Sequence, residues 1–519
     1  MIAYIGVINQ EEQEDVKRTR VRMETIRSPA FFTSVVGAFV ILFVFLRNFN
    51  EWFYVKALGK KRHELPPGDM GWPLVGTTIS FARSLMLRDP DSYISSFVSR
   101  YGRTGIYRTV MYGKPSIIVC TSDTCRRAFT DAENFKMSYP LAVQGLVGPK
   151  SFHNLSNAEH RHYRRLTASV ISGSETLSGY MAHIEEVMIS SLESWSEEGR
   201  AVEFATEMKK VGFNAVLPFV CGPFAVTFAE RMMKLLDEVI DGIGLLNINL
   251  PGFKFHKALK ARLELTEILR EVLDATRSAK EQVKVGKIRS MMDVLLSSKK
   301  EDGQPVGEEN ILDLIHMYIF ASYPSVTAVA SMIMWHLHRN PDILDKAKDE
   351  QVRILERRDS AQNGLSFQEI KQMEYLAKVI DEVLRISQAS HLFREATADV
   401  NLNGYLVPKG WKILVWVRAV HMDPKNYPNP EEFDPPRWED GEKKGATFLP
   451  FGAGRRVCPG SDLAKLELCI FLHHFLLNYE VERINPDCPI NYALLPVPAD
   501  KFLVRFRKAK DVRRAGTEG

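Results

Sequence analysis

One cysteine, Cys458, lies with two arginines in the glycine-rich stretch Phe448-Leu-Pro-Phe-Gly-Ala-Gly-Arg-Arg-Val-Cys-Pro-Gly460. The apolar-periodic run from Leu463 to Leu477 that follows predicts a buried helix. We therefore expect Cys458 at or just before a helix N-terminus. There the helix dipole and unpaired N–H groups favour an anion, so the thiol should ionise easily. Pro459 suits the first helical position, which needs no N–H.

The glycines of this stretch permit positive φ and a close backbone approach to something flat and large. A zinc site would need a second cysteine a few residues away, and a nucleophile would need a nearby base. Neither pattern accompanies Cys458. A thiolate ligand of haem needs one cysteine, room for the macrocycle and cations for two propionates, and the stretch offers all three. A structural buried cysteine is the alternative that the residues alone leave open.

The stretch also resembles the cysteine signature of the cytochrome P450 superfamily, Phe-Gly-x-Gly-x-Arg-x-Cys-x-Gly. All fixed positions are matched, by Phe451, Gly452, Gly454, Arg456, Cys458 and Gly460. The resemblance covers residues from about 65 to 507. It implies a haem-thiolate monooxygenase with haem b as cofactor and Cys458 as the ligand of the iron. It also implies that Phe451, Gly452 and Gly460 contact the haem.

Glu382 and Arg385 lie three residues apart in a helical run and therefore share a face. Alone, this spacing is typical of an ordinary surface ion pair. Arg437 follows in the stretch Phe433-Asp-Pro-Pro-Arg-Trp438. The superfamily pairs an E-x-x-R helix with a later arginine of this kind. The resemblance therefore implies a buried structural triad of Glu382, Arg385 and Arg437 that holds the cysteine loop.

Four cationic or aromatic side chains are candidates for contacts with the haem propionates, which prefer forked cations. Arg456 lies in the cysteine loop, and Arg394 precedes the later strand signals. His160 and Arg164 lie four apart in a basic helical run. Many family members carry Trp-x-x-x-Arg there, and His160 stands where the tryptophan would be. The resemblance assigns all four to the propionates; a solvated basic face is the alternative.

The helical run from Ile311 to Leu337 departs from the family's oxygen-activating segment, Ala/Gly-Gly-x-Asp/Glu-Thr/Ser. Here the segment is Ala321-Ser-Tyr-Pro-Ser325. The alcohol survives as Ser325, but Pro324 replaces the acid and should kink the helix. The acid ordinarily helps to deliver protons during oxygen activation. We therefore expect Ala321, Pro324 and Ser325 to form the catalytic segment, with the proton relay running through Ser325 and ordered water.

The remaining chain predicts a mainly α fold with a small β subdomain. The resemblance implies that this is the cytochrome P450 fold, here with an N-terminal transmembrane helix. A hairpin is expected around Tyr112-Gly113. Short strands are expected at Val400–Asn403, Tyr405–Val407, Lys412–Trp416 and Phe502–Arg507. The expected domains are a polar N-terminal extension (1–29), a membrane anchor (30–46), a linker with a proline-rich hinge (47–76), the haem-thiolate domain (77–507) and a polar tail (508–519).

The run from Ala30 to Leu46 has no charge and is just long enough to span a bilayer, with Trp52, Phe53 and Tyr54 as an interfacial belt. A cleaved signal peptide is the alternative, but no small-x-small site follows. We expect one span in the endoplasmic reticulum membrane with the catalytic domain facing the cytosol. The six cysteines form no Cys-x2-Cys pair and no dense framework, which fits a reducing compartment. A net charge of +4 and the lack of a basic motif exclude a nucleic-acid partner.

The resemblance implies a membrane-bound NADPH–cytochrome P450 reductase as electron donor. Candidate contacts for this acidic partner are Arg161, Arg165, Lys443, Lys444 and Arg455. It also places the substrate against five largely apolar segments, which suit a bulky apolar terpenoid. They are Tyr139–Ser151, Leu245–Phe255, Ala321–Ser325, Ser390–Phe393 and Leu494–Ala499.

Several stretches resemble the plant branch that holds kaurenoic acid oxidases and related triterpenoid oxidases. They are Leu65-Pro-Pro-Gly-Asp-Met-Gly-Trp-Pro-Leu74, Ser156-Asn-Ala-Glu-His160, Arg394-Glu-Ala-Thr-Ala-Asp-Val-Asn401 and Ala464-Lys-Leu-Glu467. Kaurenoic acid oxidases usually keep Ala-Gly-His-Glu-Ser in the oxygen-binding helix, and this chain does not. We therefore interpret it as a triterpenoid hydroxylase or epoxidase of specialised metabolism. The alternatives are an ent-kaurenoic acid oxidase of gibberellin biosynthesis and a non-catalytic haem protein that only binds its ligand.

Overall fold

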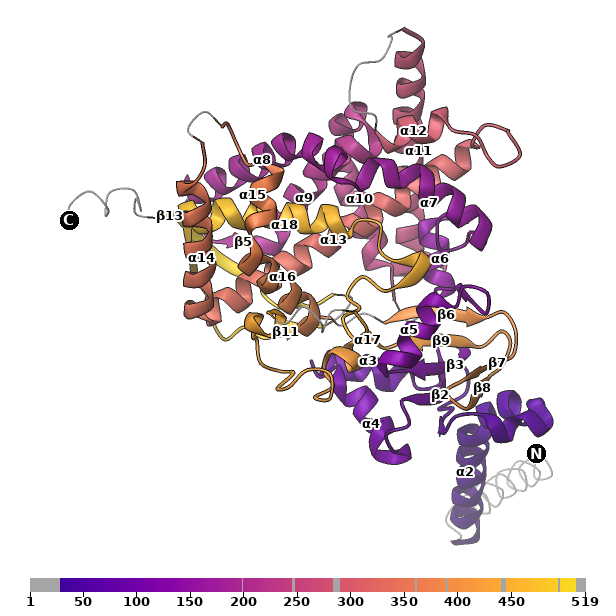
Figure 1. Cartoon of the computed structure of the whole chain (residues 1–519). Helices are drawn as coiled ribbons and strands as arrows, with labels where there is room; N and C mark the ends of the chain where they lie inside the picture. Colours follow the sequence, from indigo (N-terminus) through magenta and orange to yellow (C-terminus); the bar gives the residue numbers. More distant parts are fainter. Residues whose placement is uncertain are drawn as a thin grey trace, which may run out of the picture.

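Helices make up most of the computed structural model; the strands of the largest sheet gather at one end of the helical body, and β5 and β13 lie among the helices on the opposite side (Figure 1). The structure describes residues 29–197, 199–244, 248–282, 290–359, 362–388, 391–439, 445–492 and 495–509. The predicted mainly α fold with a small β subdomain is confirmed. The polar extension before Pro29 and nearly all of the expected tail lie outside the described residues.

The helices fall into one long series of α-helices and several short irregular turns. The α-helices are α2 (Pro29–Asn50), α3 (Thr78–Met86), α4 (Asp91–Tyr101), α5 (Ser122–Thr130), α6 (Leu141–Val147), α7 (Asn157–Ile171), α8 (Ser174–Glu197), α9 (Phe204–Cys221), α10 (Ala229–Asp241), α11 (Lys254–Gln282), α12 (Met291–Ser297), α13 (Glu308–Arg339), α14 (Pro341–Glu356), α15 (Phe367–Gln372), α16 (Glu374–Ile386), α17 (Val417–His421) and α18 (Ser461–Asn478). The short turns are η1 (Glu51–Val55), η2 (Lys56–Glu64), η3 (Pro223–Phe228), η4 (Pro435–Trp438) and η6 (Gly454–Arg456).

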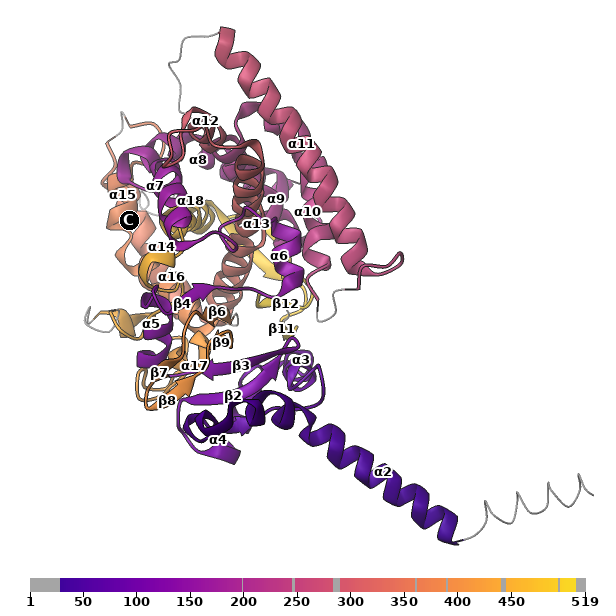
Figure 2. The ribbon, with the colours of Figure 1, turned by 90° about the vertical axis from the view of Figure 1, so that its right-hand side faces the viewer.

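The largest sheet has the strand order β1-β2-β3-β9-β6-β4. Its strands are β1 (Gly68–Asp69), β2 (Ile106–Met111), β3 (Lys114–Val119), β9 (Lys412–Val415), β6 (Leu392–Ala396) and β4 (Phe135–Met137). The predicted hairpin is β2–β3, paired antiparallel around Tyr112-Gly113. The sheet therefore joins an N-terminal segment to one almost 300 residues later, and Figure 2 shows it between the helical body and α2.

Three smaller sheets use the other strands, β5 (Val202–Glu203), β7 (Val400–Leu402), β8 (Tyr405–Val407), β10 (Tyr479–Arg483), β11 (Ile490–Asn491), β12 (Val497–Pro498) and β13 (Leu503–Lys508). The predicted strands at 400–403, 405–407, 412–416 and 502–507 correspond to β7, β8, β9 and β13. The two-residue strands carry too short a pattern to be seen in sequence. One expectation is wrong: Arg394 lies inside strand β6 and not before the strands, because β6 pairs with both β9 and β4.

Helix α13 runs through the centre of the helical body (Figure 2) and contacts α9, α11, α16 and α18. Most of its side chains are buried in the main hydrophobic core, from Ile311 at one end to Leu337 at the other. Although α13 is long and apolar enough to cross a membrane, two thirds of its apolar window is buried, which identifies it as a core helix. Because of its central position, we expect α13 to cover any group that the cysteine loop binds.

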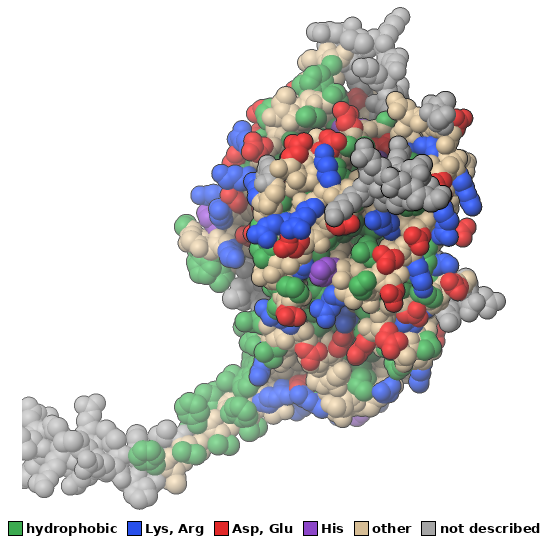
Figure 3. All heavy atoms as spheres, turned by 90° about the vertical axis from the view of Figure 1, so that its left-hand side faces the viewer, with side chains coloured by type: hydrophobic (Ala, Val, Ile, Leu, Met, Phe, Trp, Pro, Cys, Tyr) green, Lys and Arg blue, Asp and Glu red, His purple; other side chains and the backbone are tan. Residues whose placement is uncertain are grey.

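Helix α2 projects away from the sheet, and apolar side chains cover its visible surface (Figures 2 and 3). None of its apolar window is buried, and its 22 residues suffice to cross a bilayer. The end of the helix is fixed to the domain. Arg47 makes a two-pronged ion pair with Asp69 at 2.8 and 2.6 Å, and Arg108 pairs with Glu51 at 2.9 Å. The expected linker is therefore helical at its start and packed against β1 and β2.

Candidate active site

The cysteine loop turns back on itself just before α18 and contains the short turn η6. The Cys458 N–H donates to the carbonyl oxygen of Phe451 at 3.0 Å, and the Gly452 N–H donates to that of Leu449 at 3.0 Å. Gly452 and Gly454 have φ of 74° and 71°, values that other residues rarely adopt. The two glycines therefore allow the chain to double back beneath the thiol.

Helix α18 begins at Ser461, with Gly460 as its N-cap. Pro459 thus precedes the helix, and its prediction as the first helical residue is wrong. Burial raises the pKa of the Cys458 thiol, whereas the N–H of Gly460 and the charge of Arg164 lower it, with a net upward shift. The expectation that the helix terminus by itself ionises the thiol is therefore also wrong, because burial outweighs it. Coordination to a metal ion deprotonates a thiol outright.

The surroundings of Cys458 leave room for a flat group. A Cβ at Gly460 would meet nothing within 4 Å, and one at Gly452 would meet only Leu392 Cδ1 at 4.0 Å. Gly454 serves another purpose, because its Cβ would lie 2.9 Å from the Phe129 carbonyl oxygen of α5. Within the buried α13, Ala321 is exposed. An exposed patch on a central helix, together with the open glycines below, fits a macrocycle between them.

Three arginines from distant segments gather near this loop without a carboxylate partner among the described residues. Arg394 is buried and donates only to the Phe393 carbonyl oxygen. Arg456 donates to the Phe152 and Leu155 carbonyl oxygens and to Asn157 Oδ1 at 2.9, 3.3 and 3.0 Å. Burial and Arg394 lower the pKa of Arg456 to about 10. Buried guanidinium groups in this state call for an anion, and haem propionates fit.

His160 is buried at the same place. Burial, followed by the charges of Arg456, Arg164 and Arg394, lowers its pKa to about 3, so the imidazole is neutral. Three arginines thus lie close enough to His160 to influence its pKa. These four side chains come from α7, β6 and the cysteine loop, and they are the four that the sequence assigns to the propionates. Two negative propionates would relieve the mutual repulsion of these cations.

His153 belongs to this cluster and was missed in the sequence. Its ring stacks on Tyr139 with centroids 4.1 Å apart, and its Nδ1 is buried without a partner. Burial, Arg456 and Arg394 lower its pKa to about 3. The available signal was its place between the predicted substrate loop and the basic helix, but a single histidine in a loop has no spacing pattern that marks it.

Glu382, Arg385 and Arg437 meet in a closed network. Arg385 makes a two-pronged pair with Glu382 at 2.8 and 2.9 Å, and both side chains have no exposed surface. Arg437 Nε donates to Glu382 Oε1 at 2.8 Å, and Trp438 Nε1 donates to Oε2 at 3.0 Å. Arg385 also donates to the His421 carbonyl oxygen at 2.9 Å. The geometry is that of a structural lock with every carboxylate oxygen in use.

His421 extends this network to the cysteine loop. Its Nδ1 lies 3.2 Å from the Arg385 carbonyl oxygen, and the Leu449 N–H donates to its Nε2 at 3.0 Å. Only the neutral tautomer with hydrogen on Nδ1 satisfies both contacts. The sequence offered no sign of this role, because the three partners are far apart along the chain.

In α13, the helix continues through Pro324, and Ser325 Oγ donates to the Ser322 carbonyl oxygen at 3.3 Å. Pro324 and Ser325 are half-buried and Ala321 is exposed, so the predicted catalytic segment borders open space. Of the expected substrate segments, part of 139–151 and Phe393 of 390–393 line a cavity of about 790 Å³. Residues 245–247, 390 and 494 lie outside the described residues, as do Lys443 and Lys444 of the expected reductase face.

Among the described residues, no group of three or more His, Cys, Asp or Glu side chains could hold a separate metal ion. The chemistry of the site therefore centres on Cys458, which is not in a disulfide. One free thiol, two glycines with open space around them and nearby arginines without a carboxylate partner among the described residues form a donor set that fits haem.

Comparisons with known proteins agree. The family model for cytochrome P450 matches residues 66–504. Beta-amyrin 11-oxidase of Glycyrrhiza uralensis is 46% identical, covering 89% of this chain and 95% of that protein. A 7,8-epoxymelianol synthase of Ailanthus altissima (92% and 96% covered) and ent-kaurenoic acid oxidase 1 of Arabidopsis thaliana (91% and 96%) are each 44% identical.

The retinoic acid-bound cyanobacterial CYP120A1 is a solved structure with the same fold. The two superpose with a TM-score of 0.76 at 25% identity, covering 86% of this chain and 99% of that chain. Fold, cysteine loop and sequence relatives thus give one answer. The chain belongs to the cytochrome P450 family, and it is a monooxygenase whose cofactor is haem b.

Proposed function

We propose that the enzyme oxidises a triterpenoid, by hydroxylation or epoxidation, with O2 and electrons from NADPH–cytochrome P450 reductase. The observation that carries the reaction type is the cysteine loop, in which the free thiol of Cys458 lies near Arg394 and Arg456, two arginines without a carboxylate partner among the described residues. The substrate class is supported by relatives named for oxidising β-amyrin and for making 7,8-epoxymelianol. Plant specialised metabolism is the setting that these relatives suggest.

In this proposal Cys458 binds the haem iron, and Arg456, Arg394, Arg164 and His160 bind the propionates. Bound haem supplies the iron at which O2 is reduced and the substrate is oxidised. The protein's part is to position the substrate against Ala321, to exclude bulk water with the apolar face of α13 and to deliver protons. Pro324 stands in place of an acid, so the segment 321–325 offers only hydroxyl groups for proton delivery. These are Ser322, Tyr323 and Ser325, of which we assign the role to Ser325.

An ent-kaurenoic acid oxidase is the second candidate, since such an enzyme of Arabidopsis thaliana is equally similar at 44% identity. The segment Ala321-Ser-Tyr-Pro-Ser325 speaks against it, because those enzymes usually keep a glycine and an acid there. A haem protein without turnover is the candidate of another class. Helix α2, exposed and apolar, supports a single anchor in the endoplasmic reticulum membrane with the catalytic domain in the cytosol.

The axial ligand is tested by carbon monoxide. The reduced wild-type complex should absorb at the position typical of thiolate ligation, and Cys458→Ala should abolish that band. Cys469→Ala, which removes a buried thiol within α18, is the matched control and should keep the thiolate-type band. A Cys458→Ala protein with an intact thiolate band would refute the assignment.

The substrate class is tested by co-expression with a plant reductase and a panel of triterpenoid and diterpenoid scaffolds, with product analysis by mass spectrometry. Oxidation of β-amyrin-type scaffolds without oxidation of ent-kaurenoic acid supports the proposal. The reverse preference establishes the second candidate. A thiolate-type carbon monoxide band with no product from either panel and no NADPH consumption favours the non-catalytic ligand binder.

A further inference from the structure

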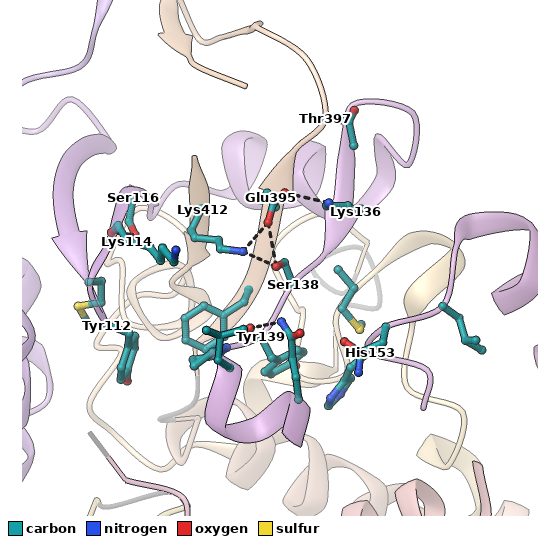
Figure 4. A pocket seen from close by; sticks show the side chains of 18 of the residues that line it. Tyr112, Lys114, Ser116, Lys136, Ser138, Tyr139, His153, Glu395, Thr397 and Lys412 are labelled. Atoms are coloured by element: carbon teal, nitrogen blue, oxygen red, sulfur yellow. Dashed lines mark hydrogen bonds and ion pairs between the residues drawn. The ribbon is translucent and has the colours of Figure 1, made fainter. Parts of the chain in front are cut away.

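A row of polar side chains crosses four strands of the large sheet. The register aligns Ser116 of β3 with Lys412 of β9, Lys412 with Glu395 of β6, and Glu395 with Lys136 of β4. Side chains in register across a sheet project from the same face. Figure 4 shows Lys412, Glu395 and Lys136 directed toward one another, with Ser138 just beyond the end of β4 joining them.

This row forms one wall of the cavity of about 790 Å³, a volume typical of small-molecule sites. Aromatic side chains, including Tyr139 and Phe393, lie on the cavity wall as well. Asn157, which accepts a hydrogen bond from Arg456, also borders it, and so does His153, whose ring stacks on Tyr139. The cavity therefore extends from the polar row to a residue that contacts Arg456.

Within the row, the Glu395 carboxylate has its hydrogen-bond partners, whereas the ammonium groups of Lys412 and Lys136 keep N–H donors without a partner in the row. Glu395 pairs with Lys412 and, at 2.9 Å, with Lys136, and it accepts a hydrogen bond from Ser138 Oγ at 3.1 Å. Burial raises the pKa of Glu395, but the hydrogen bonds from both lysines bring it below its ordinary value, so it stays ionised. Each ammonium has three N–H donors. Lys412 spends two, on Glu395 and Ser138, and Lys136 spends one.

The unused groups of the row are thus N–H donors with one excess positive charge, and Lys114 adds a third ammonium at the same cavity. The Lys412 and Glu395 side chains are only 17% and 20% exposed, so their field is less screened than that of surface charges. A ligand group that matches spare N–H donors and excess positive charge is an anionic oxygen acceptor. The neighbouring aromatic rings match a hydrocarbon.

We propose that Lys412 binds the carboxylate of an acidic terpenoid. Glu395 and Ser138 hold Lys412 in place, Lys136 adds positive charge, and the hydrocarbon body of the ligand lies over Tyr139 and Phe393. The assignment rests on the proposed function of the enzyme as a terpenoid oxidase. The row then selects oxygenated substrates and fixes which end faces the haem. A charge-assisted hydrogen bond is stronger than a neutral one, so the acid is preferred over the alcohol with the same skeleton.

The test is spectral titration of the purified haem-loaded enzyme, read as the Soret shift on ligand binding. Three acid–alcohol pairs serve as probes: oleanolic acid with erythrodiol, ent-kaurenoic acid with ent-kaurenol, and dodecanoic acid with dodecanol. In Lys412→Met the Kd of an acid should rise about tenfold or more, while that of its alcohol changes less than about threefold. Lys136→Met should give a smaller change of the same kind. Lys425→Met, an exposed lysine outside the cavity, is the control.

The three pairs separate this inference from the proposed function. Acid-selective loss with the oleanolic acid pair supports both, and acid-selective loss with the ent-kaurenoic acid pair alone keeps the carboxylate site but favours the second candidate function. Acid-selective loss with dodecanoic acid, in an enzyme that binds neither terpenoid scaffold, keeps the carboxylate site and overturns terpenoid oxidation. Equal loss for acid and alcohol, or no loss in any pair, with both variants retaining the thiolate-type carbon monoxide band, overturns the carboxylate site.

Discussion

We expect oxygen activation in this chain to depend most on Ser325. Pro324 has neither a side-chain acid nor an N–H, and it occupies the position where relatives of this family usually carry a proton donor. Ser325 Oγ is half-buried and donates to the Ser322 carbonyl oxygen at 3.3 Å, a weak bond that it can exchange for water. A hydroxyl in this state can accept a proton from one neighbour and pass one to the next.

We therefore expect Ser325→Ala to lower product formation by about a hundredfold or more and to release more hydrogen peroxide per NADPH, because a proton relay typically contributes at least that factor. Ser331→Ala removes a buried hydroxyl from the same helix and should leave coupling unchanged. Pro324→Glu should raise coupling above that of the wild type. Unchanged coupling in Ser325→Ala would place the relay elsewhere.

His421 makes stability depend on pH. Burial and the charge of Arg385 hold its pKa at about 3, against 6.5 in an unfolded chain. As pH falls below about 6.5, the unfolded chain binds a proton that the folded one refuses, so the contribution of His421 to stability is present above pH 6.5 and is lost progressively toward pH 3. Protonation of Nε2 would also break the hydrogen bond from Leu449.

His421→Phe should destabilise the enzyme by about 1–3 kcal/mol at pH 7.5, because the Leu449 N–H loses its buried partner. The difference in the free energy of unfolding between wild type and variant should be smaller at pH 5.5. The wild type loses stability there because its unfolded state binds a proton at His421, and the variant has no such group. Urea midpoints at the two pH values, followed by the Soret band, measure this. His63→Phe, at an exposed position, should show no pH-dependent difference. A gap that widens at pH 5.5 would contradict the assignment.

Residues with a fixed spacing could be predicted from sequence, and those joined only by the fold could not. Cys458, Arg456 and the pair Glu382–Arg385 lie within short patterns that chemistry dictates. His153 and His421 act through partners up to hundreds of residues away, and burial, which sets their pKa values, is a property of the packed molecule. The thiol of Cys458 shows the same limit, because its helix was predicted and the dominant effect of burial was not.

At the scale of elements, the network around Glu382 joins α16 to η4, α17 and, through His421, the start of the cysteine loop. Periodicity predicted α13, α18 and the β2–β3 hairpin, since long or alternating patterns are strong signals. It did not predict β1, β5, β11 or β12, which have two residues each and exist because their partners are already in place. The loop that carries Cys458 is likewise positioned by neighbours rather than by its own sequence.

Arg437→Ala should therefore cost about 3–5 kcal/mol, the typical result of breaking a buried ion pair, and should lower the urea concentration at which the thiolate-type carbon monoxide band disappears. The Arg437 side chain is only 6% exposed. Arg231→Ala, which breaks an exposed pair with Glu264, is the matched control and should cost less than about 1 kcal/mol. Equal effects of the two changes would mean that the network does not hold the loop.

At the scale of the whole molecule, we expect the proposed anchor and the charge distribution together to determine how a reductase docks. Arg47, Asn50 and Glu51 fix the end of α2 to β1, the following turn and β2, so an anchor in a bilayer would also orient the domain. Helix α7 begins beside the cysteine loop, because Arg456 bonds to Leu155 and Asn157 at its start. The exposed Arg161 and Arg165 of α7 therefore lie near the thiolate side of the haem, where an acidic reductase would deliver electrons.

Arg161→Glu combined with Arg165→Glu should slow reduction of the haem by reductase at low ionic strength, since complementary charges mainly raise the association rate. The difference should vanish near 1 M salt, where the screening length is about 3 Å. Lys234→Glu with Lys260→Glu makes the same change of charge on exposed positions of α10 and α11, which Figure 2 places on the other side of the helical body, and should leave the rate unchanged. Stopped-flow reduction under carbon monoxide measures the rate directly.

A slowing that persists at high salt would indicate a damaged haem site, and equal slowing by both pairs would mean that net charge, and not the α7 face, governs docking.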